Sequence, residues 1–195
     1  MKVIGINGSP RKGGNTTILI NKVFEELNKQ GIETELIELS GKNIKQCLGC
    51  MSCTREQDHK CIMTDDFYEI YLKISEAQGL LFGSPVYNAS ITSQMKAFID
   101  RLGFATFNGV LKHKVGASVV AVRRGGAISA VDTLNHFFAH HEMFTVGSTY
   151  WNMVYGMNIG DVENDQEGIA NMKNIGENMA WLLKKIHTQE VMIHE

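Results

Sequence analysis

The sequence lacks several features that would assign it at once to a broad class of proteins. Its 195 residues contain no block rich in lysine and arginine, and the formal net charge is −2, so neither nucleic acid nor an anionic membrane is expected as a partner. No apolar run is long enough to span a bilayer, and the first residues lead into a short apolar segment rather than a signal sequence. The expectation is therefore a cytoplasmic protein.

The common phosphate-binding fingerprints are also missing, although the segment 7–17, Asn-Gly-Ser-Pro-Arg-Lys-Gly-Gly-Asn-Thr-Thr, comes close to one of them. Gly8 and Gly13 have the P-loop interval, but Gly14-Asn15 replaces Lys-Ser/Thr, so a nucleoside triphosphate with magnesium is not expected. No G-x-G-x-x-G is present. The glycines and hydroxyl groups still predict an anion cradle at a helix N-terminus, best suited to a monophosphate. The alternative is an ordinary capped helix start with a flexible loop.

Cysteine is absent from most of the chain. All four cysteines lie in one stretch with the spacing C-x2-C-x2-C-x7-C, at Cys47, Cys50, Cys53 and Cys61. Thiols gathered in this way indicate a cofactor rather than a core or a set of disulfides. Three cysteines at x2 intervals allow one tight loop to surround an iron–sulfur cubane, and a fourth can complete the coordination. Zinc sites more often use two separated C-x2-C pairs, and zinc remains the alternative.

Short apolar runs alternate along the chain with segments of helical periodicity. Strands are expected at Val3–Ile6, Glu35–Leu39, Gly79–Gly83, Gly116–Val122 and Phe144–Thr149, and helices at Thr16–Gln30, Asp66–Ser75, Ser90–Leu102, Ile128–His141 and Glu167–Ile186. This alternation predicts an α/β fold, a three-layer sandwich around a parallel sheet, formed by one domain over residues 1–195. Ligands bind such sheets beyond the carboxyl ends of the strands. Two connections there are unusually long, Ser40–Asp65 and Tyr150–Gln166, and long loops are commonly functional.

Proline is rare, and both prolines lie in loops that follow an expected strand. Pro10 belongs to the anion cradle, and Pro85 stiffens the turn after the third strand, where free N–H groups could address the edge of a planar ring. Tyr87 offers a flat apolar surface in the same turn. The turn Arg123–Gly126 follows the fourth strand and could bring backbone donors to a ligand, although such turns are often simply solvated.

Together these motifs resemble the NAD(P)H-dependent FMN reductase family of flavodoxin-like proteins. The resemblance rests on Ser9–Arg11 with Asn15-Thr16, and on Ser84–Tyr87 with Lys96–Arg101. With the compact cysteine motif followed by Asp65-Asp66, the chain resembles the iron–sulfur flavoprotein branch over nearly its whole length. The resemblance implies a doubly wound five-stranded sheet of order 2-1-3-4-5, bound FMN, one [4Fe–4S] cluster, and a homodimer or homotetramer.

The same resemblance implies roles for the residues that match the family motifs. The FMN phosphate would be held by Ser9, Arg11, Asn15, Thr16 and Thr17. The isoalloxazine ring would be lined by Pro85, Val86, Tyr87 and Asn88, and a third flavin loop would contain Arg124, Gly125 and Gly126. The cluster ligands would be Cys47, Cys50, Cys53 and Cys61.

The activity implied is that of a flavin-dependent oxidoreductase. FMN exchanges one or two electrons and a [4Fe–4S] centre exchanges one, so a chain holding both could couple hydride-type reduction to single-electron steps without a catalytic acid, base or nucleophile of its own. A positive charge from Arg123 or Arg124 near the flavin N1 edge would favour the reduced, anionic flavin. Expected donors are ferredoxin or NAD(P)H, and the acceptor would be a small molecule or a protein. Two alternatives stay open: an NAD(P)H-dependent FMN or quinone reductase without a cluster, and a zinc-stabilised electron carrier or binding module.

Two aromatic residues and the end of the chain complete the expectations from the sequence. Trp151 and Tyr155 begin the second long loop, where they could contact the core, contact another subunit or cover a flavin. A frayed or packing tail is expected for His187–Glu195.

Overall fold

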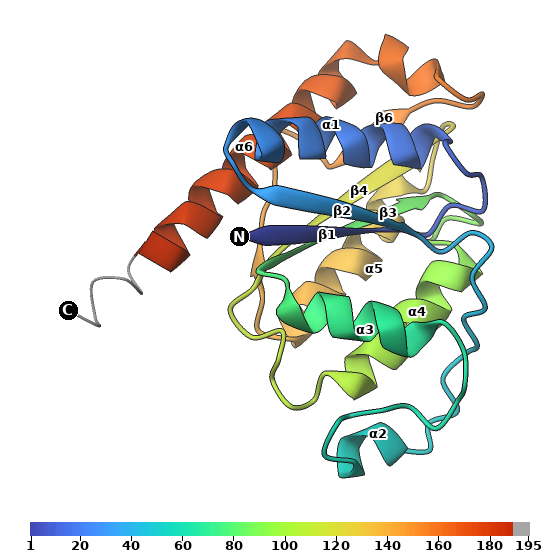
Figure 1. The fold of residues 1–195 in the computed structure, drawn as a ribbon. Coiled ribbons are helices and arrows are strands. Elements are labelled where there is room, and N and C mark those ends of the chain that lie inside the picture. The colour runs from blue at the N-terminus through green and yellow to red at the C-terminus, as the bar shows by residue number, and fades with distance from the viewer. Residues whose placement is uncertain (189–195) are drawn as a thin grey trace.

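A parallel sheet forms the centre of the computed structural model, which describes residues 1–188 (Figure 1). Neighbouring strands follow the order β2-β1-β3-β4-β5, and β6 pairs with β4. The expected order 2-1-3-4-5 is therefore confirmed. Of the expected tail, residues 189–195 lie outside the described part of the chain. The strands are β1 (Lys2–Asn7), β2 (Glu33–Glu38), β3 (Gly79–Pro85), β4 (Val115–Val122), β5 (Phe144–Thr145) and β6 (Met153–Tyr155).

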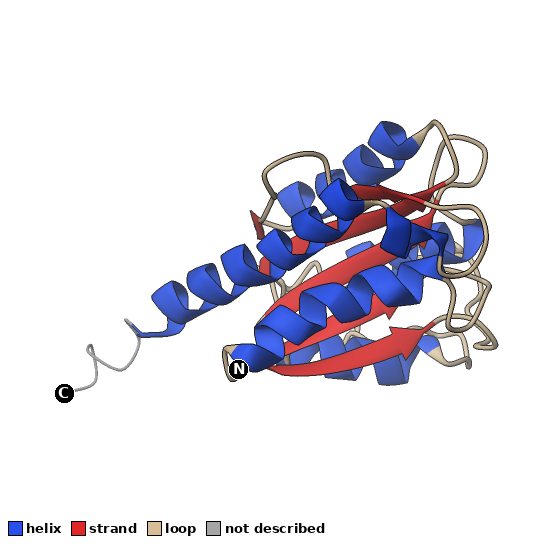
Figure 2. Cartoon of the chain, turned by 90° about the horizontal axis from the view of Figure 1, so that it is seen from above, coloured by secondary structure: helices blue, strands red, loops and turns tan. Residues whose placement is uncertain are grey.

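Helices cover both faces of the sheet (Figures 1 and 2). One hydrophobic cluster joins α1 and α6 to one face, and a second joins α3, α4 and α5 to the other. None of the helices within residues 1–188 is both long and apolar enough to cross a membrane. The short helix α2, inside the cysteine stretch, was not predicted. The helices are α1 (Asn15–Lys29), α2 (Ser52–Arg55), α3 (Phe67–Glu76), α4 (Ser93–Ala105), α5 (Ala127–His140) and α6 (Gln166–Thr188), with a 3-10 turn η1 (Asp161–Asn164).

Helix α1 approaches the sheet closely because residue 83 of β3 is glycine. A Cβ added to Gly83 would lie 2.7 Å from Cδ1 of Ile20 and 2.9 Å from Cγ2 of Thr16, which is too close for either contact. Gly31, with a φ of +76°, takes the left-handed conformation that ends α1 directly after the last residue of the predicted helix, Gln30. The close packing brings the N-terminus of α1 to the carboxyl end of β3.

The fifth strand differs from its prediction. It was expected as one run, Phe144–Thr149, but β5 pairs with β4 only at Phe144 and Thr145. The chain then leaves the sheet, and β6 returns beside Val120–Val122 at the other end of β4. Side-chain hydrogen bonds stabilise the segment between β5 and β6; Ser148 Oγ donates to the carbonyl of Tyr150 at 2.6 Å. The predicted strand is therefore wrong over residues 146–149, and the expected loop Tyr150–Gln166 contains both β6 and η1.

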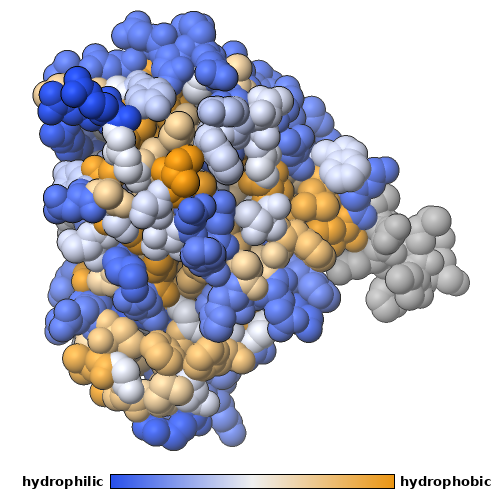
Figure 3. All heavy atoms as spheres, turned by 180° about the vertical axis from the view of Figure 1, so that it is seen from behind, coloured by the Kyte–Doolittle hydropathy of each residue, from blue (hydrophilic) through white to orange (hydrophobic). Residues whose placement is uncertain are grey.

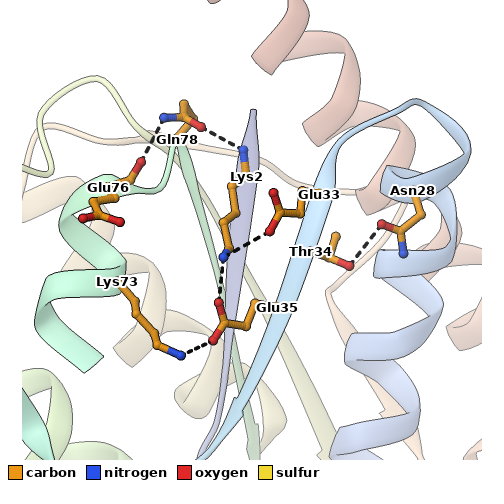
Figure 4. A network of polar contacts seen from close by, with 8 residues as sticks. All are labelled: Lys2, Asn28, Glu33, Thr34, Glu35, Lys73, Glu76 and Gln78. Atoms are coloured by element: carbon orange, nitrogen blue, oxygen red, sulfur yellow. Dashed lines mark hydrogen bonds and ion pairs between the residues drawn. The ribbon is translucent and has the colours of Figure 1, made fainter. Parts of the chain in front are cut away.

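A polar network holds the amino-terminal edge of the sheet (Figure 4). Lys2 Nζ lies 2.7 Å from Glu35 Oε2 and 3.2 Å from Glu33 Oε1, and Lys73 pairs with Glu35 from α3. The backbone N–H of Lys2 donates to Gln78 Oε1 at 2.8 Å. Hydrogen bonds from Lys2 and Lys73 lower the pKa of Glu35. Surface ion pairs of this kind contribute little to stability, and the functional loops lie at the opposite, carboxyl edge.

Candidate functional site

A cavity of about 230 Å³ opens at the carboxyl edge of the sheet. Its walls come from the loops that follow β1, β3, β4 and β6, which is where an open parallel sheet binds its ligands. The wall residues are Ser9, Arg11, Asn15, Thr16, Pro85, Val86, Tyr87, Ala121, Arg123, Gly156, Met157 and Ile159.

The loop between β1 and α1 is curled by its own side chains. Asn7 Oδ1 accepts a hydrogen bond from the N–H of Ser9 at 2.9 Å, and Ser9 Oγ accepts one from the N–H of Arg11 at 3.1 Å. The N-cap of α1 is Gly14, so no side chain caps the free N–H groups of the first turn. The hydroxyl of Thr16 is buried in this wall and has no hydrogen-bond partner within residues 1–188. An uncapped helix end and an unpartnered hydroxyl fit a phosphate group.

The side chains of Thr17 and Asn15 bind other parts of the protein, so neither is free for the phosphate-binding role that the family motifs imply. Thr17 Oγ1 donates to Glu38 Oε1 and accepts from Asn7 Nδ2, both at 2.9 Å, so its hydroxyl is already bound at the edge of β2. Asn15 lies in the cavity wall, but its carboxamide binds the backbone of residues 158–160, at 2.8 Å from both its nitrogen and its oxygen. Asn15 therefore fastens a distant loop over the cavity.

That distant loop follows β6 and supplies three wall residues that the sequence did not reveal: Gly156, Met157 and Ile159. Asp161 Oδ2 accepts from the N–H of Met157 at 3.2 Å and from that of Asn158 at 2.7 Å. The backbone N–H of Asn158 is the main reason that the pKa of Asp161 is lowered. The signal in the sequence was the unusual length of this connection.

Two aromatic residues of the same region lie elsewhere. Trp151 lines a separate hollow of about 370 Å³ with Tyr150, beside the interruption of the fifth strand. Tyr155 is exposed and is absent from the cavity wall. Neither aromatic ring covers the cavity in this structure.

The carboxyl end of β3 and the loop that follows it place three of the four predicted ring-lining residues in the cavity wall: Pro85, Val86 and Tyr87. Asn88 instead forms a tight turn with Ala89, with left-handed φ values of +49° and +60°. The turn is closed by the N–H of Tyr87, which donates to the carbonyl of residue 90 at 2.8 Å. Two consecutive left-handed residues are the signature of a hairpin turn, and they are costly for alanine.

The loop after β4 contributes Arg123 to the wall, whereas Arg124, Gly125 and Gly126 lie outside it. Gly126 has a φ of +86°, and an added Cβ would lie 2.8 Å from Cα of Ala89. This glycine therefore lets the two loops pack against each other. The wall contains two arginines, at positions 11 and 123, and no carboxylate in the part of the chain that the structure describes, so the cavity favours an anionic ligand.

A second candidate site lies in the long connection between β2 and α3. Two aspartates at the end of this connection bind residues near its beginning. Asp66 Oδ2 accepts from the N–H of Asn43 at 2.7 Å. Asp65 accepts from the N–H of Lys45 at 3.0 Å and pairs with Arg101 of α4, and the side chains of this ion pair are 0% and 1% exposed. Burial acts to raise the pKa of Asp65, but the hydrogen bonds from Arg101 and from backbone N–H groups outweigh it, so the pKa is lowered.

The four predicted cysteine ligands line one hollow at the end of the molecule that carries α2. Left-handed φ values at Gly49 (+63°) and Met51 (+58°) curl the segment, and the N–H of Gly49 lies 3.4 Å from Sγ of Cys47 as a hydrogen-bond donor. Burial, with the neighbouring thiols of Cys61 and Cys47, raises the pKa of the Cys53 thiol. Within residues 1–188, no group of three His, Cys, Asp or Glu side chains is placed to hold a single metal ion.

The donor set of this hollow nevertheless fits an iron–sulfur cluster. Four cysteines line one space, no Asp or Glu among residues 1–188 lines it, and an N–H group already donates to one sulfur. The space is small, about 20 Å³, so the segment has to widen to admit a cubane. Apolar side chains gather on the surface of this end of the molecule (Figure 3), and three of them, Leu48, Met51 and Ile62, are exposed and line the hollow.

Comparisons with known proteins show which family the chain resembles. The family model described as NADPH-dependent FMN reductase matches residues 1–158. An iron–sulfur flavoprotein of Methanocaldococcus jannaschii is 38% identical over 193 residues, covering 95% of this chain and 99% of that protein. One from Methanosarcina thermophila is 33% identical over 189 residues, covering 95% and 97%. A solved flavodoxin, a WrbA-like protein from Agrobacterium tumefaciens, superimposes with a TM-score of 0.64 at 15% identity, covering 94% and 97% of the two chains.

The family implied by the sequence motifs is thus confirmed, and with it the flavodoxin-like fold and the flavin chemistry. The chain belongs to the NADPH-dependent FMN reductase family, within its iron–sulfur flavoproteins, and is a flavin-dependent oxidoreductase.

Proposed function

We propose that this chain passes electrons between a [4Fe–4S] cluster, held by Cys47, Cys50, Cys53 and Cys61, and FMN bound in the cavity. The observation that carries the proposal is the presence of two separate hollows in one chain: a cavity at the carboxyl edge with two arginines in its wall, and a hollow lined by four cysteines. Electrons would come from a donor such as ferredoxin or NAD(P)H and would leave to a small-molecule or protein acceptor.

In the cavity, the residues of this chain bind and orient FMN, which supplies the one- and two-electron chemistry when bound. Arg11, the first turn of α1 and the free hydroxyl of Thr16 would hold the phosphate. Pro85 and Tyr87 would lie against the ring, and Arg123 would supply the positive charge that favours the reduced, anionic flavin. Of the two arginines considered for that charge, Arg123 is the one in the cavity wall.

We further propose that residues 1–195 form one domain that assembles as a homodimer or homotetramer in the cytoplasm. Both hydrophobic clusters pack on the same sheet, which supports one domain. Exposed apolar side chains surround the cysteine hollow, and Tyr150 and Trp151 are exposed at the separate hollow of about 370 Å³. A homo-oligomer would therefore have apolar surface to bury. A reducing compartment would keep the thiols available to a cluster.

The test compares one-electron with two-electron reduction of the flavin. Cys50 is the exposed thiol, so Cys50→Ser removes a ligand without opening a core cavity, and Ser52→Ala is the control in the same segment. Under anaerobic conditions, the proposal predicts that Cys50→Ser abolishes flavin reduction by reduced ferredoxin but retains FMN and its reduction by NAD(P)H. Equal ferredoxin-driven rates in wild type and Cys50→Ser would contradict it and would favour a cluster-free FMN or quinone reductase.

A further inference from the structure

Among the described residues, Arg101 supplies the charged side chain in the wall of the cysteine hollow. It extends from α4 and is 2% exposed. Its Nη1 pairs with Asp65 and lies 3.4 Å from the carbonyl oxygen of Lys45, and its Cζ lies 4.2 Å from the centre of the Phe67 ring. These contacts use one nitrogen of the guanidinium group and one of its faces.

The other two nitrogens of Arg101 have no hydrogen-bond partner. Nε and Nη2 are buried, and neither finds an acceptor among residues 1–188. Buried donors without partners are rare in folded proteins, and they are more costly on a charged group than on a neutral one. Such donors call for an acceptor that residues 1–188 do not supply.

Arg101 lines the same hollow as the four cysteines. Most of the other wall residues are apolar, among them Leu48, Met51, Ile62 and Phe104, and they offer no strong acceptor. Sulfur atoms that carry negative charge are the acceptors that a group bound to these cysteines would bring into the hollow.

We propose that Arg101 donates hydrogen bonds from Nε and Nη2 to sulfur atoms of the cluster and thereby raises its reduction potential. This inference rests on the proposed function. Reduction adds negative charge to the cluster, so donors to its sulfurs stabilise the reduced form more than the oxidised form. Asp65 neutralises the charge of Arg101, so the effect comes from the two N–H donors.

The structure also explains why lysine could not take this role. A lysine ammonium could satisfy Asp65, but it has no planar fork with further donors fixed in other directions. Arg101→Lys therefore keeps the buried charge pair and removes the two donors. The double variant Arg101→Gln with Asp65→Asn removes both charges together, so no unpaired buried charge remains to unfold the chain.

The experiment measures the midpoint potential of the cluster in the FMN-loaded holoprotein, by an anaerobic redox titration followed by electron paramagnetic resonance. Arg55→Gln is the matched control, because Arg55 is an exposed arginine of the same segment that donates to the carbonyl of Cys50 at 3.2 Å. The FMN potential, measured in the same titration, is the internal reference.

We expect both Arg101→Lys and the double variant to lower the midpoint potential of the cluster. At a fixed solution potential, the ratio of oxidised to reduced cluster should rise by about tenfold, which corresponds to a fall of 59 mV in the midpoint potential of a one-electron couple. Arg55→Gln should keep the wild-type potential, and the FMN potential should not move. A cluster that is present with an unchanged potential in both Arg101 variants would overturn this inference alone. Wild-type protein that binds no iron and sulfide would overturn the inference together with the cluster.

Discussion

Asp65 and Asp66 follow the cysteine segment in the chain, and removing one or the other carboxylate should have very different effects on stability. Asp65 forms a buried ion pair with Arg101 and accepts from the N–H groups of Lys45 and Phe67, at 3.0 and 3.2 Å. Asp65→Ala leaves the Arg101 charge buried without a partner, which costs about 3 kcal/mol or more. Asp66→Ala is the matched control, since its carboxylate accepts from the N–H of Asn43, a loss of about 1 kcal/mol.

Urea unfolding measures this difference directly. At neutral pH, Asp65→Ala should lower the unfolding free energy by about 2 kcal/mol more than Asp66→Ala, and its melting temperature should fall by roughly 10 °C. The pKa of Asp65 is lowered in the folded chain, so its contribution is complete above the unfolded pKa of about 4 and is lost as the pH falls through the folded pKa. The two variants should therefore converge in stability at acidic pH. Equal losses of unfolding free energy in the two variants at neutral pH would refute the stabilising role of the Asp65–Arg101 ion pair.

Three further predictions concern the flavin cavity. Asn15→Ala removes both hydrogen bonds to residues 158–160, so it should weaken FMN binding by about tenfold and should speed proteolysis of the 156–161 loop in the flavin-free protein; unchanged proteolysis would mean that Asn15 does not fasten the loop. Gly126→Ala should destabilise the chain by about 2 kcal/mol or more in urea unfolding, because its φ is +86° and its Cβ would clash with the neighbouring turn, whereas Gly125→Ala, with nothing within 4 Å, should be nearly neutral. Arg123→Ala should lower the FMN reduction potential in a dye-coupled titration, and Arg124→Ala should leave it unchanged, since only the former residue lines the cavity; equal potentials in the two variants would exclude Arg123 as the tuning charge.

The fold could be predicted from the sequence because its signal is local. Apolar runs and helical periodicity alternate, and a parallel sheet follows from that alternation. The predicted extent of the fifth strand was wrong because the apolar run that begins with Phe144, Thr145 and Val146 resembles the start of one longer strand. The interruption depends on hydrogen bonds of Ser148 and Asn152, including a bond from the N–H of Val120 to the carbonyl of Asn152. Pairing of that kind is not visible in an apolar pattern.

Ser9 and Pro85, which the sequence placed in loops at the carboxyl edge of the sheet, do line the cavity. Side-chain direction was not predictable, because it depends on neighbours that are distant in the sequence. Asn15 binds residues 143 and 145 positions away, and Arg101 finds Asp65 36 positions away. The motifs therefore indicated residues that lie at the two candidate sites but not the partners that each one binds.

The content of FMN, iron and acid-labile sulfide in one anaerobic preparation shows whether the chain holds both cofactors. We expect one FMN with about four irons and four sulfides per chain, and a flavin spectrum with added broad absorption from the cluster. FMN without iron or sulfide, after anaerobic reconstitution with both, would contradict this expectation.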